Sequence, residues 1–135
     1  MKSYLAINQV LDRLAAFEGQ PMQVEGVLEV HEEGYALKHY PNAERRSEHL
    51  DEGYSYQSGI WIEFGSGSVQ PNGKVLDRWH GKRVRVYGVF HGLASLPSVR
   101  ALSKGGFGPW GFWPAVIEPT SIQRVSAEER RESGA

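Results

Sequence analysis

The chain has 135 residues, of which 40% are hydrophobic and 23% charged, and its formal net charge at pH 7 is -1. This length and composition predict one soluble globular domain and leave no room for a second. No apolar run reaches the ~20 residues of a membrane span, and Met1 to Phe17 lacks the apolar stretch of a signal peptide. Because the chain has no cysteine, disulfides and thiolate chemistry are excluded and we expect a cytoplasmic protein.

The near-zero net charge conceals two opposed blocks. Residues 18–52 hold nine acidic residues against three basic ones (Lys38, Arg45 and Arg46), a local charge of -6. Residues 74–104 hold seven basic residues against Asp77 alone, a local charge of +6. Oppositely charged residues commonly pair across adjacent strands, so we expect the blocks to neutralise each other. The basic block could also attract an anionic partner.

The first pattern is helical. Apolar residues recur at helical spacing from Ile7 to Phe17, Ser3 is a candidate N-cap, and Gly19 is a candidate terminator. We therefore predict an N-terminal amphipathic helix within residues 1–19 that packs on the rest of the domain.

The next pattern has the period of two that is typical of strands. It runs from Met22 to Val30 and predicts a long, half-buried strand whose outward face is partly acidic. A turn at Gly34 then leads to the alternation of Tyr35 to His39, which predicts a second strand in a hairpin with the first.

The middle of the chain alternates irregular and regular segments. Residues 41–58 (PNAERRSEHLDEGYSYQS) have no sustained period, so we predict a long exposed loop. Gly59 to Gly65 predicts a short strand with Trp61 on its outward face, and residues 74–79 predict one or two helical turns.

The last third contains two strands and an irregular segment. Residues 83–92 predict a long strand with Arg83, Arg85 and Tyr87 on one face. Residues 93–114, which end in GGFGPWGFWP, predict irregular structure because glycine and proline dominate. Residues 115–125 predict a last strand bent at a proline, and residues 126–135 a flexible polar tail.

The order of these elements resembles the OB-fold, a small five-stranded Greek-key barrel. The resemblance is carried by MQVEGVLEV (22–30), GIWIEFG (59–65), WHGKRVRVYGVFHG (79–92) and WPAVIEPTSIQRV (113–125). These segments look like the anticodon-binding-type OB domains and their small bacterial relatives.

The resemblance implies a mainly β fold, with an OB-like barrel over residues 20–125 and a short helix between its third and fourth strands. An SH3-like barrel is the main alternative. Gly26 and Gly88, each inside a long strand, permit the bulge or bend that a small barrel needs. The resemblance also implies a binding face on the middle strands, framed by the loops 41–58 and 93–114.

Catalytic and metal-binding motifs are absent from the sequence. The sequence HEE at 31–33 does not extend to H-E-x-x-H, since residue 35 is tyrosine, and the histidines lack zinc-site spacing. GSGSVQ around Ser66 does not match G-x-S-x-G, and GGFG at 105–108 lacks the phosphate-binding pattern. We expect no enzyme activity, no metal and no cofactor.

The leading functional hypothesis is a non-catalytic module that binds a protein. The candidate partner-binding residues are Tyr40, Arg45, Arg46, Asp51, Glu52, Tyr54 and Tyr56. Tyrosine and arginine often anchor interfaces, and clustered acids speed association with a basic partner. This favours an inhibitor or immunity-type protein that neutralises a basic toxin or enzyme. The alternative for this loop is a solvated segment whose tyrosines fold back on the barrel.

A second hypothesis is single-stranded nucleic-acid binding through Trp61, Arg83, Arg85 and Tyr87, because such sites combine cations with aromatic stacking platforms. The competing structural interpretation is that both arginines meet the acidic first strand while the aromatic residues pack under loops. A third hypothesis uses the aromatic residues between Phe107 and Trp113 to bind a small molecule or oligosaccharide. These aromatic residues are equally interpretable as a plug that closes one end of the barrel.

Overall fold

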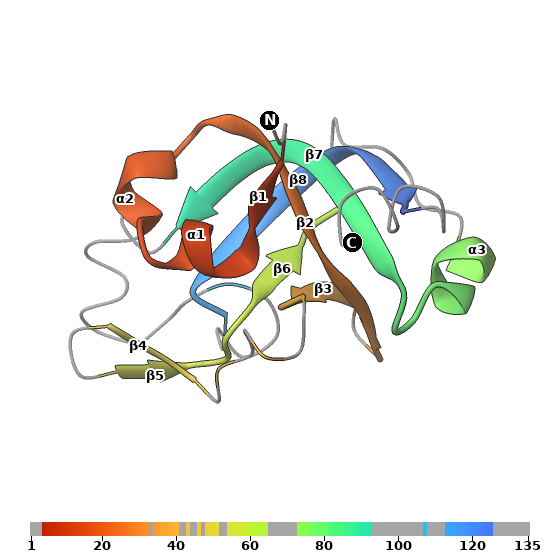
Figure 1. Cartoon of the computed structure of the whole chain (residues 1–135), viewed down its shortest axis with the longest axis horizontal. Coiled ribbons are helices and arrows are strands. Elements are labelled where there is room, and N and C mark those ends of the chain that lie inside the picture. The colour runs from red at the N-terminus through yellow and green to blue at the C-terminus, as the bar shows by residue number, and fades with distance from the viewer. Residues whose placement is uncertain are drawn as a thin grey trace.

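The fold was obtained as a computed structural model, which describes residues 4–32, 34–40, 43, 46, 48–51, 54–64, 73–92, 107 and 113–125. The elements in chain order are β1 (Leu5–Ala6), α1 (Ile7–Leu11), α2 (Leu14–Phe17), β2 (Pro21–His31), β3 (Gly34–Lys38), β4 (His49–Asp51), β5 (Tyr54–Tyr56), β6 (Ile60–Ile62), α3 (Gly73–Arg78), β7 (Arg83–Gly92) and β8 (Ala115–Arg124) (Figure 1).

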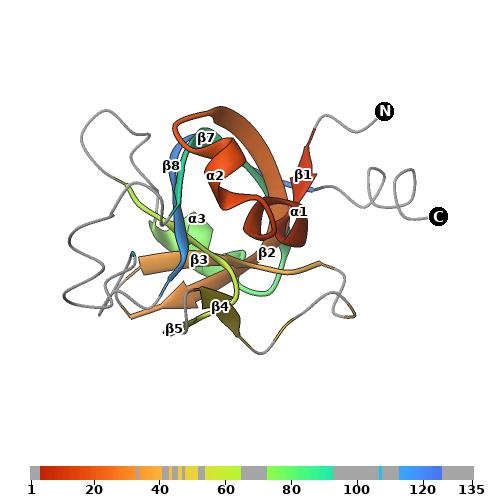
Figure 2. The same ribbon diagram turned by 90° about the vertical axis from the view of Figure 1, so that its left-hand side faces the viewer.

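Five strands close into a barrel. The sheet order is β1-β2-β3-β6-β8-β7, and a further pairing between β2 and β7 joins the two sides (Figures 1 and 2). All barrel pairings are antiparallel except β6 with β8, which is parallel. The predicted mainly β fold, a closed five-stranded barrel with α3 between its third and fourth strands, is confirmed. The resemblance to the OB-fold and to its anticodon-binding domains stays a prediction.

Two glycines allow the long strands to bend. A Cβ at Gly26 would lie 2.6 Å from the carbonyl oxygen of Lys38, so only glycine allows this close approach of β2 and β3. Gly88 lies at a register shift between β7 and β8 and pairs with Pro119. A Cβ there would collide with the backbone of Glu118. The bend predicted near the proline of the last strand is therefore a β-bulge.

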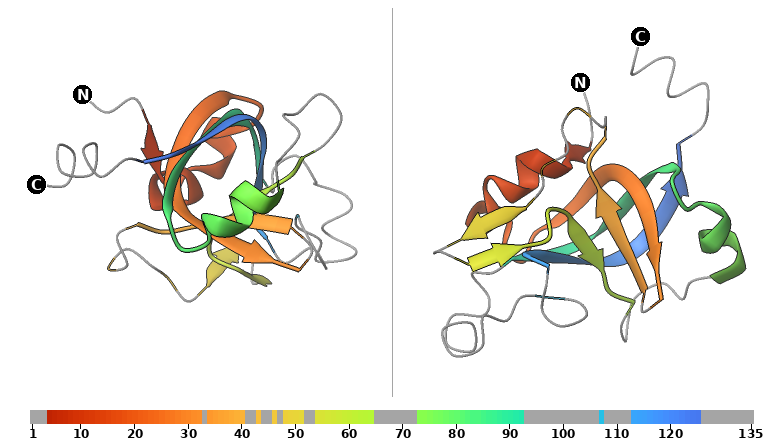
Figure 3. Two further views of the ribbon diagram at one scale, coloured as in Figure 1. Left: turned by 90° about the vertical axis from the view of Figure 1, so that its right-hand side faces the viewer. Right: turned by 90° about the horizontal axis from the view of Figure 1, so that it is seen from below.

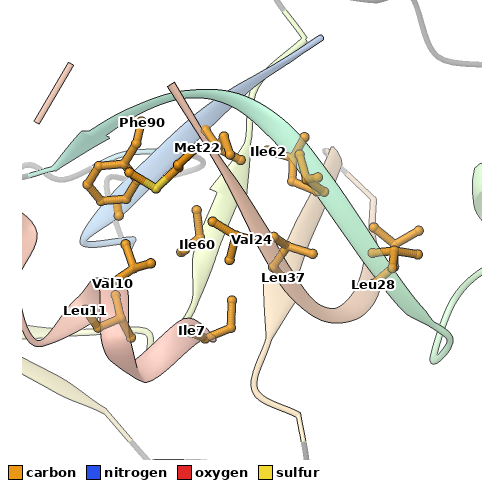
Figure 4. Packing of buried hydrophobic residues seen from close by; sticks show 14 of the residues in the cluster. Ile7, Val10, Leu11, Met22, Val24, Leu28, Leu37, Ile60, Ile62 and Phe90 are labelled. Carbon is orange, nitrogen blue, oxygen red and sulfur yellow. The ribbon is translucent and has the colours of Figure 1, made fainter. Parts of the chain in front are cut away.

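The core fills the barrel interior. Side chains such as Val24 and Leu28 of β2, Leu37 of β3 and Phe90 of β7 point inward, as the period of two predicts (Figure 4). The buried core residues are Ile7, Val10, Leu11, Met22, Val24, Leu28, Leu37, Ile60, Ile62, Leu76, Val84, Val86, Phe90, Ala115 and Ile117. Residues from α1 and α3 belong to this cluster, so both helices pack against the core.

The N-terminal segment is helical as predicted, but the helix is shorter than the pattern indicated and is divided into two pieces. Residues Leu5 and Ala6 form a short strand parallel to β2, and the helix is interrupted after Leu11. Arg13 has φ -140° and ψ 45°, outside the helical region. This break lets the α1 residues enter the core while Leu14 of α2 packs at its edge. Gly19, with φ 74°, ends the segment as predicted.

The segment predicted as a long exposed loop also contains regular structure. Strands β4 and β5 form a separate two-stranded antiparallel sheet in the middle of residues 41–58. Predictions for Ser3, for most of residues 93–114 and for the tail 126–135 lie outside the described residues. In the described part of the chain, none of the helices is long and apolar enough to span a membrane.

Candidate functional site

The β4–β5 hairpin presents one exposed face. Its register pairs His49 with Tyr56, Leu50 with Ser55 and Asp51 with Tyr54, so Leu50 and Ser55 lie opposite each other on the same side. Leu50 is 65% exposed, more than any other large hydrophobic residue that the structure describes. The carboxylate of Glu48 accepts a hydrogen bond from the Ser55 hydroxyl on this side. We call the exposed residues Glu48, Leu50, Ser55 and Gln57 the hairpin face.

The chain is anchored ahead of the hairpin by an ion pair. Two guanidinium nitrogens of Arg46 donate to the Asp12 carboxylate, at 2.7 and 3.1 Å, directly after α1. The hydrogen bond from Arg46 and its positive charge, with a smaller contribution from His49, hold the pKa of Asp12 below its ordinary value, although partial burial opposes the shift.

The chain is anchored after the hairpin by buried groups. Tyr56 is buried, and next along the chain Ser58 and His39 are joined through Oγ and Nε2 at 3.1 Å. The Lys38 ammonium donates to the Ser58 carbonyl oxygen at 3.3 Å. Anchors on both sides pre-organise the hairpin, so less conformational entropy is lost when a partner binds.

Of the predicted partner-binding residues, Tyr40, Arg46 and Tyr56 are engaged in contacts within the protein. Tyr40 is 39% exposed but lies under the guanidinium of Arg83, 4.3 Å from the ring centroid, whereas Tyr56 is buried. Arg46 is engaged with Asp12. Asp51 and Tyr54 lie on the hairpin strands, and Arg45 and Glu52 lie outside the described residues. The hairpin face was missed, although a lone leucine in an acidic, tyrosine-rich segment was a visible signal.

The two arginines of the predicted nucleic-acid face are held by a single carboxylate. Glu25 accepts from Nε of Arg83 at 2.6 Å and from Nε of Arg85 at 2.8 Å, and it also pairs with a terminal nitrogen of Arg83. Glu25 and Arg83 are only 5% and 7% exposed. The guanidinium of Arg85 lies 4.2 Å from the ring centroid of Tyr4. The expected neutralisation between the acidic and basic blocks is thus seen at this pair of strands.

The aromatic residues of that predicted face are separated. Tyr87 is 44% exposed on β7, but Trp61 is only 4% exposed, so the expectation of an outward stacking platform on β6 is wrong. The reason is a second cluster outside the barrel, formed by Ala36, Trp61, Trp113 and Val116, with Phe107 packed against it. The ring centroids of Trp61 and Trp113 are 5.6 Å apart.

Two glycines make room for the tryptophan rings. A Cβ at Gly34 would lie 2.6 Å from Trp61, and one at Gly59 would lie 2.9 Å from Trp113. The backbones of Phe107 and Trp113 hydrogen-bond to each other, at 2.7 and 3.0 Å. Phe107 and Trp113 therefore lie together in the cluster that buries Trp61.

In the part of the chain that the structure describes, titratable side chains elsewhere do not assemble a metal site. His91 contacts Glu18 through Nδ1 at 2.7 Å and Glu118 through Nε2 at 3.1 Å. The imidazole therefore lies between the two carboxylates, and the three groups do not point at a common position. No group of three histidine, aspartate or glutamate side chains in the described ranges is arranged to hold a metal ion.

Comparisons with known proteins give distant structural similarities. No family model and no curated protein matches the chain. OBody AM3L15, bound to hen egg-white lysozyme, has 16% identity and a TM-score of 0.48 over 93% of this chain and 96% of that chain. OBody AM3L09, also bound to lysozyme, has 13% identity and a TM-score of 0.49 over 93% and 97%.

A DUF3299 family protein from Pseudomonas aeruginosa has 12% identity and a TM-score of 0.44 over 90% of this chain and 83% of that chain. Because all these TM-scores lie below 0.5, neither the fold nor the function of this chain is inferred from these similarities.

Proposed function

We propose that this chain is a non-catalytic barrel that binds a protein through the hairpin face. The observation that carries the proposal is the exposure of Leu50, at 65%, at the centre of a hairpin anchored on both sides. A large apolar side chain ringed by the polar residues Glu48, Ser55 and Gln57 has the layout of an interface anchor with a polar rim. Holding it on a pre-organised strand pair favours tight binding.

The charge around the hairpin suggests a basic partner. Residues 41–58 contain Glu44, Glu48, Asp51 and Glu52 against Arg45 and Arg46. Because Asp12 neutralises Arg46, the net charge near the hairpin is more negative than the count over residues 41–58 indicates. Acidic surfaces attract basic proteins and raise the association rate. We therefore propose an inhibitor or immunity-type role against a basic toxin or enzyme.

The experiment compares capture by three immobilised proteins. Wild type, Leu50→Ser and the control Tyr87→Ser are incubated with lysate of the source cells, and retained proteins are quantified by mass spectrometry. Tyr87 is also exposed but lies on β7, outside the hairpin. Losing a buried leucine contact costs about 1–2 kcal/mol, or roughly tenfold in affinity.

The proposal is supported when a basic protein is retained by wild type and Tyr87→Ser and is retained less by Leu50→Ser. The purified partner should then bind wild type and Tyr87→Ser with similar affinity and Leu50→Ser more weakly. Equal retention by all three proteins would remove the hairpin face from the proposal.

Nucleic-acid binding through Trp61, Arg83, Arg85 and Tyr87 has less support. The guanidinium groups are occupied by Glu25, and Trp61 is buried, so only Tyr87 retains the exposure that base stacking needs.

A further inference from the structure

The basic block of residues 74–104 divides into two parts in the fold. Arg83 and Arg85 lie against Glu25, and two further basic residues lie outside the described part of the chain. The remaining three, Lys74, Arg78 and Lys82, are exposed on α3 and the turn that follows it. Arg124, also exposed, ends β8. We call Lys74, Arg78, Lys82 and Arg124 the basic end.

The fold gathers these four residues at one end of the barrel. In α3, Leu76 is buried in the core, while Lys74 and Arg78 are one helical turn apart on a shared, exposed side. The backbone of Lys82 joins the turn after α3 to β2. Its N–H donates to the Trp79 carbonyl at 2.8 Å, and its carbonyl accepts from the N–H of Leu28 at 2.9 Å.

Arg124 is brought to the same end by strand pairing. Its Cα is opposite that of Val84, and the next residue, Val125, donates to the carbonyl of Arg83 at 2.9 Å. Lys82 directly precedes Arg83, so Lys82 and Arg124 lie on neighbouring segments. Figure 3 shows α3, the start of β7 and the end of β8 together, at the opposite end of the long axis from the β4–β5 hairpin.

Positive charges outnumber negative ones at this end. Within the described ranges, Arg78, Lys82 and Arg124 make no ion pair. Asp77 is the one acidic residue in 73–92, and it accepts a hydrogen bond from the Tyr35 hydroxyl at 3.3 Å. The pKa of the Tyr35 phenol is raised, mainly by burial and to a smaller extent by this contact with the Asp77 carboxylate.

The basic end also lacks an apolar anchor. Among the described residues, the exposed large hydrophobics are Tyr40, Leu50 and Tyr87, and none of them belongs to α3 or its adjoining turn. Protein interfaces usually centre on buried aromatic or aliphatic anchors. A surface of exposed cations without such a centre suits a phosphate backbone, which is bound through charge and without reading bases.

We propose that the basic end binds the phosphate backbone of nucleic acid without sequence preference. This site is distinct from the face predicted from the sequence, since it uses the exposed cations in place of Arg83 and Arg85. It is also independent of the proposed protein-binding role, because the hairpin face lies at the other end of the barrel.

The expected salt dependence follows from the number of cations. Each phosphate contact with a single strand contributes about -0.7 to the slope of log affinity against log salt, so three contacts, by Arg78, Lys82 and Arg124, give about -2. Between about 50 and about 200 mM salt, the affinity should then fall roughly 20-fold. Loss of one contact should reduce the magnitude of the slope by about 0.7 and weaken binding roughly fivefold at the lower salt.

The test is fluorescence anisotropy with labelled single strands of about 20 nucleotides in two unrelated sequences. Wild type is compared with Lys82→Glu, Arg124→Glu and the control Arg13→Glu, each of which changes the net charge by the same amount. Arg13 is exposed between α1 and α2, away from the basic end. Circular dichroism and thermal melting verify that each variant is folded, and Lys82→Gln or Arg124→Gln replaces a variant that is not.

We expect both sequences to bind equally, with affinity reduced by Lys82→Glu and Arg124→Glu and changed less than twofold by Arg13→Glu and Leu50→Ser. Absence of binding at low salt, or equal losses in all charge variants, would overturn the proposal. Stronger displacement by polyglutamate than by unlabelled DNA would assign the basic end to an acidic protein and would overturn it as well.

Discussion

Replacing Glu25 with glutamine should sharply destabilise the barrel. The substitution keeps the size of the side chain but removes the charge that holds Arg83 and Arg85, and the single amide oxygen can keep only one of the contacts at 2.6 and 2.8 Å. Because Glu25 and Arg83 are 5% and 7% exposed, water cannot replace the lost partner fully. Removing one member of a buried ion pair costs about 3–5 kcal/mol. We expect a loss of about 3 kcal/mol, since Arg85 is only partly buried.

The measurement is urea unfolding followed by circular dichroism, with the free energy of unfolding taken from linear extrapolation. Glu63→Gln is the matched control, because Glu63 is an exposed carboxylate and its change should stay within about 0.5 kcal/mol. A double-mutant cycle with Arg83→Gln should show a coupling energy above about 1 kcal/mol. A loss below about 1 kcal/mol for Glu25→Gln would refute the view that one carboxylate stabilises both arginines.

Two further predictions concern backbone geometry and pH. Gly34→Ala should lower the free energy of unfolding by about 2 kcal/mol and alter tryptophan fluorescence, because Gly34 has φ 152° and a Cβ would meet Trp61; urea unfolding with stability unchanged would contradict this. Because the pKa of Asp12 is lowered in the folded protein, its pair with Arg46 stabilises the fold at pH values above 3.8, the ordinary pKa. This stabilisation is lost as the pH falls through the pKa of Asp12 in the folded protein. Because the pair is exposed, its contribution to the free energy of unfolding should be below about 1 kcal/mol. In Arg46→Ala the pKa of Asp12, measured by NMR titration, should return to about 3.8.

The barrel could be predicted because its long strands carry their own signal. β2 and β7 alternate apolar and polar residues for about ten positions each, and this period determines which face enters the core. The β4–β5 hairpin has three residues per strand, too few to establish a period. The break after Leu11 depends on how α1 and α2 fit the barrel, which local helical spacing does not encode.

The site was less predictable because exposure depends on tertiary packing. Trp61 faces away from the barrel core, as its alternation predicted, but Trp113 covers it from a segment about 50 residues later. Arg83 and Arg85 occupy the expected strand, and their neutralisation followed from charge pairing between strands. Leu50 is the one leucine of residues 41–58, but its exposure depends on the pairing of β4 with β5, which the sequence did not predict.

The short strand β1 has a consequence for the solubility of the protein. β3 pairs with β2 only from Val27 onward, so Val24 and Glu25 of β2 would present an open edge on that side without Leu5 and Ala6. Open strand edges recruit strands from other molecules and lead to aggregation or domain swapping. Shortening the chain before α1 should therefore change the tendency to self-associate more than it changes the core, and a bulky fusion placed close to Leu5 would carry the same hazard.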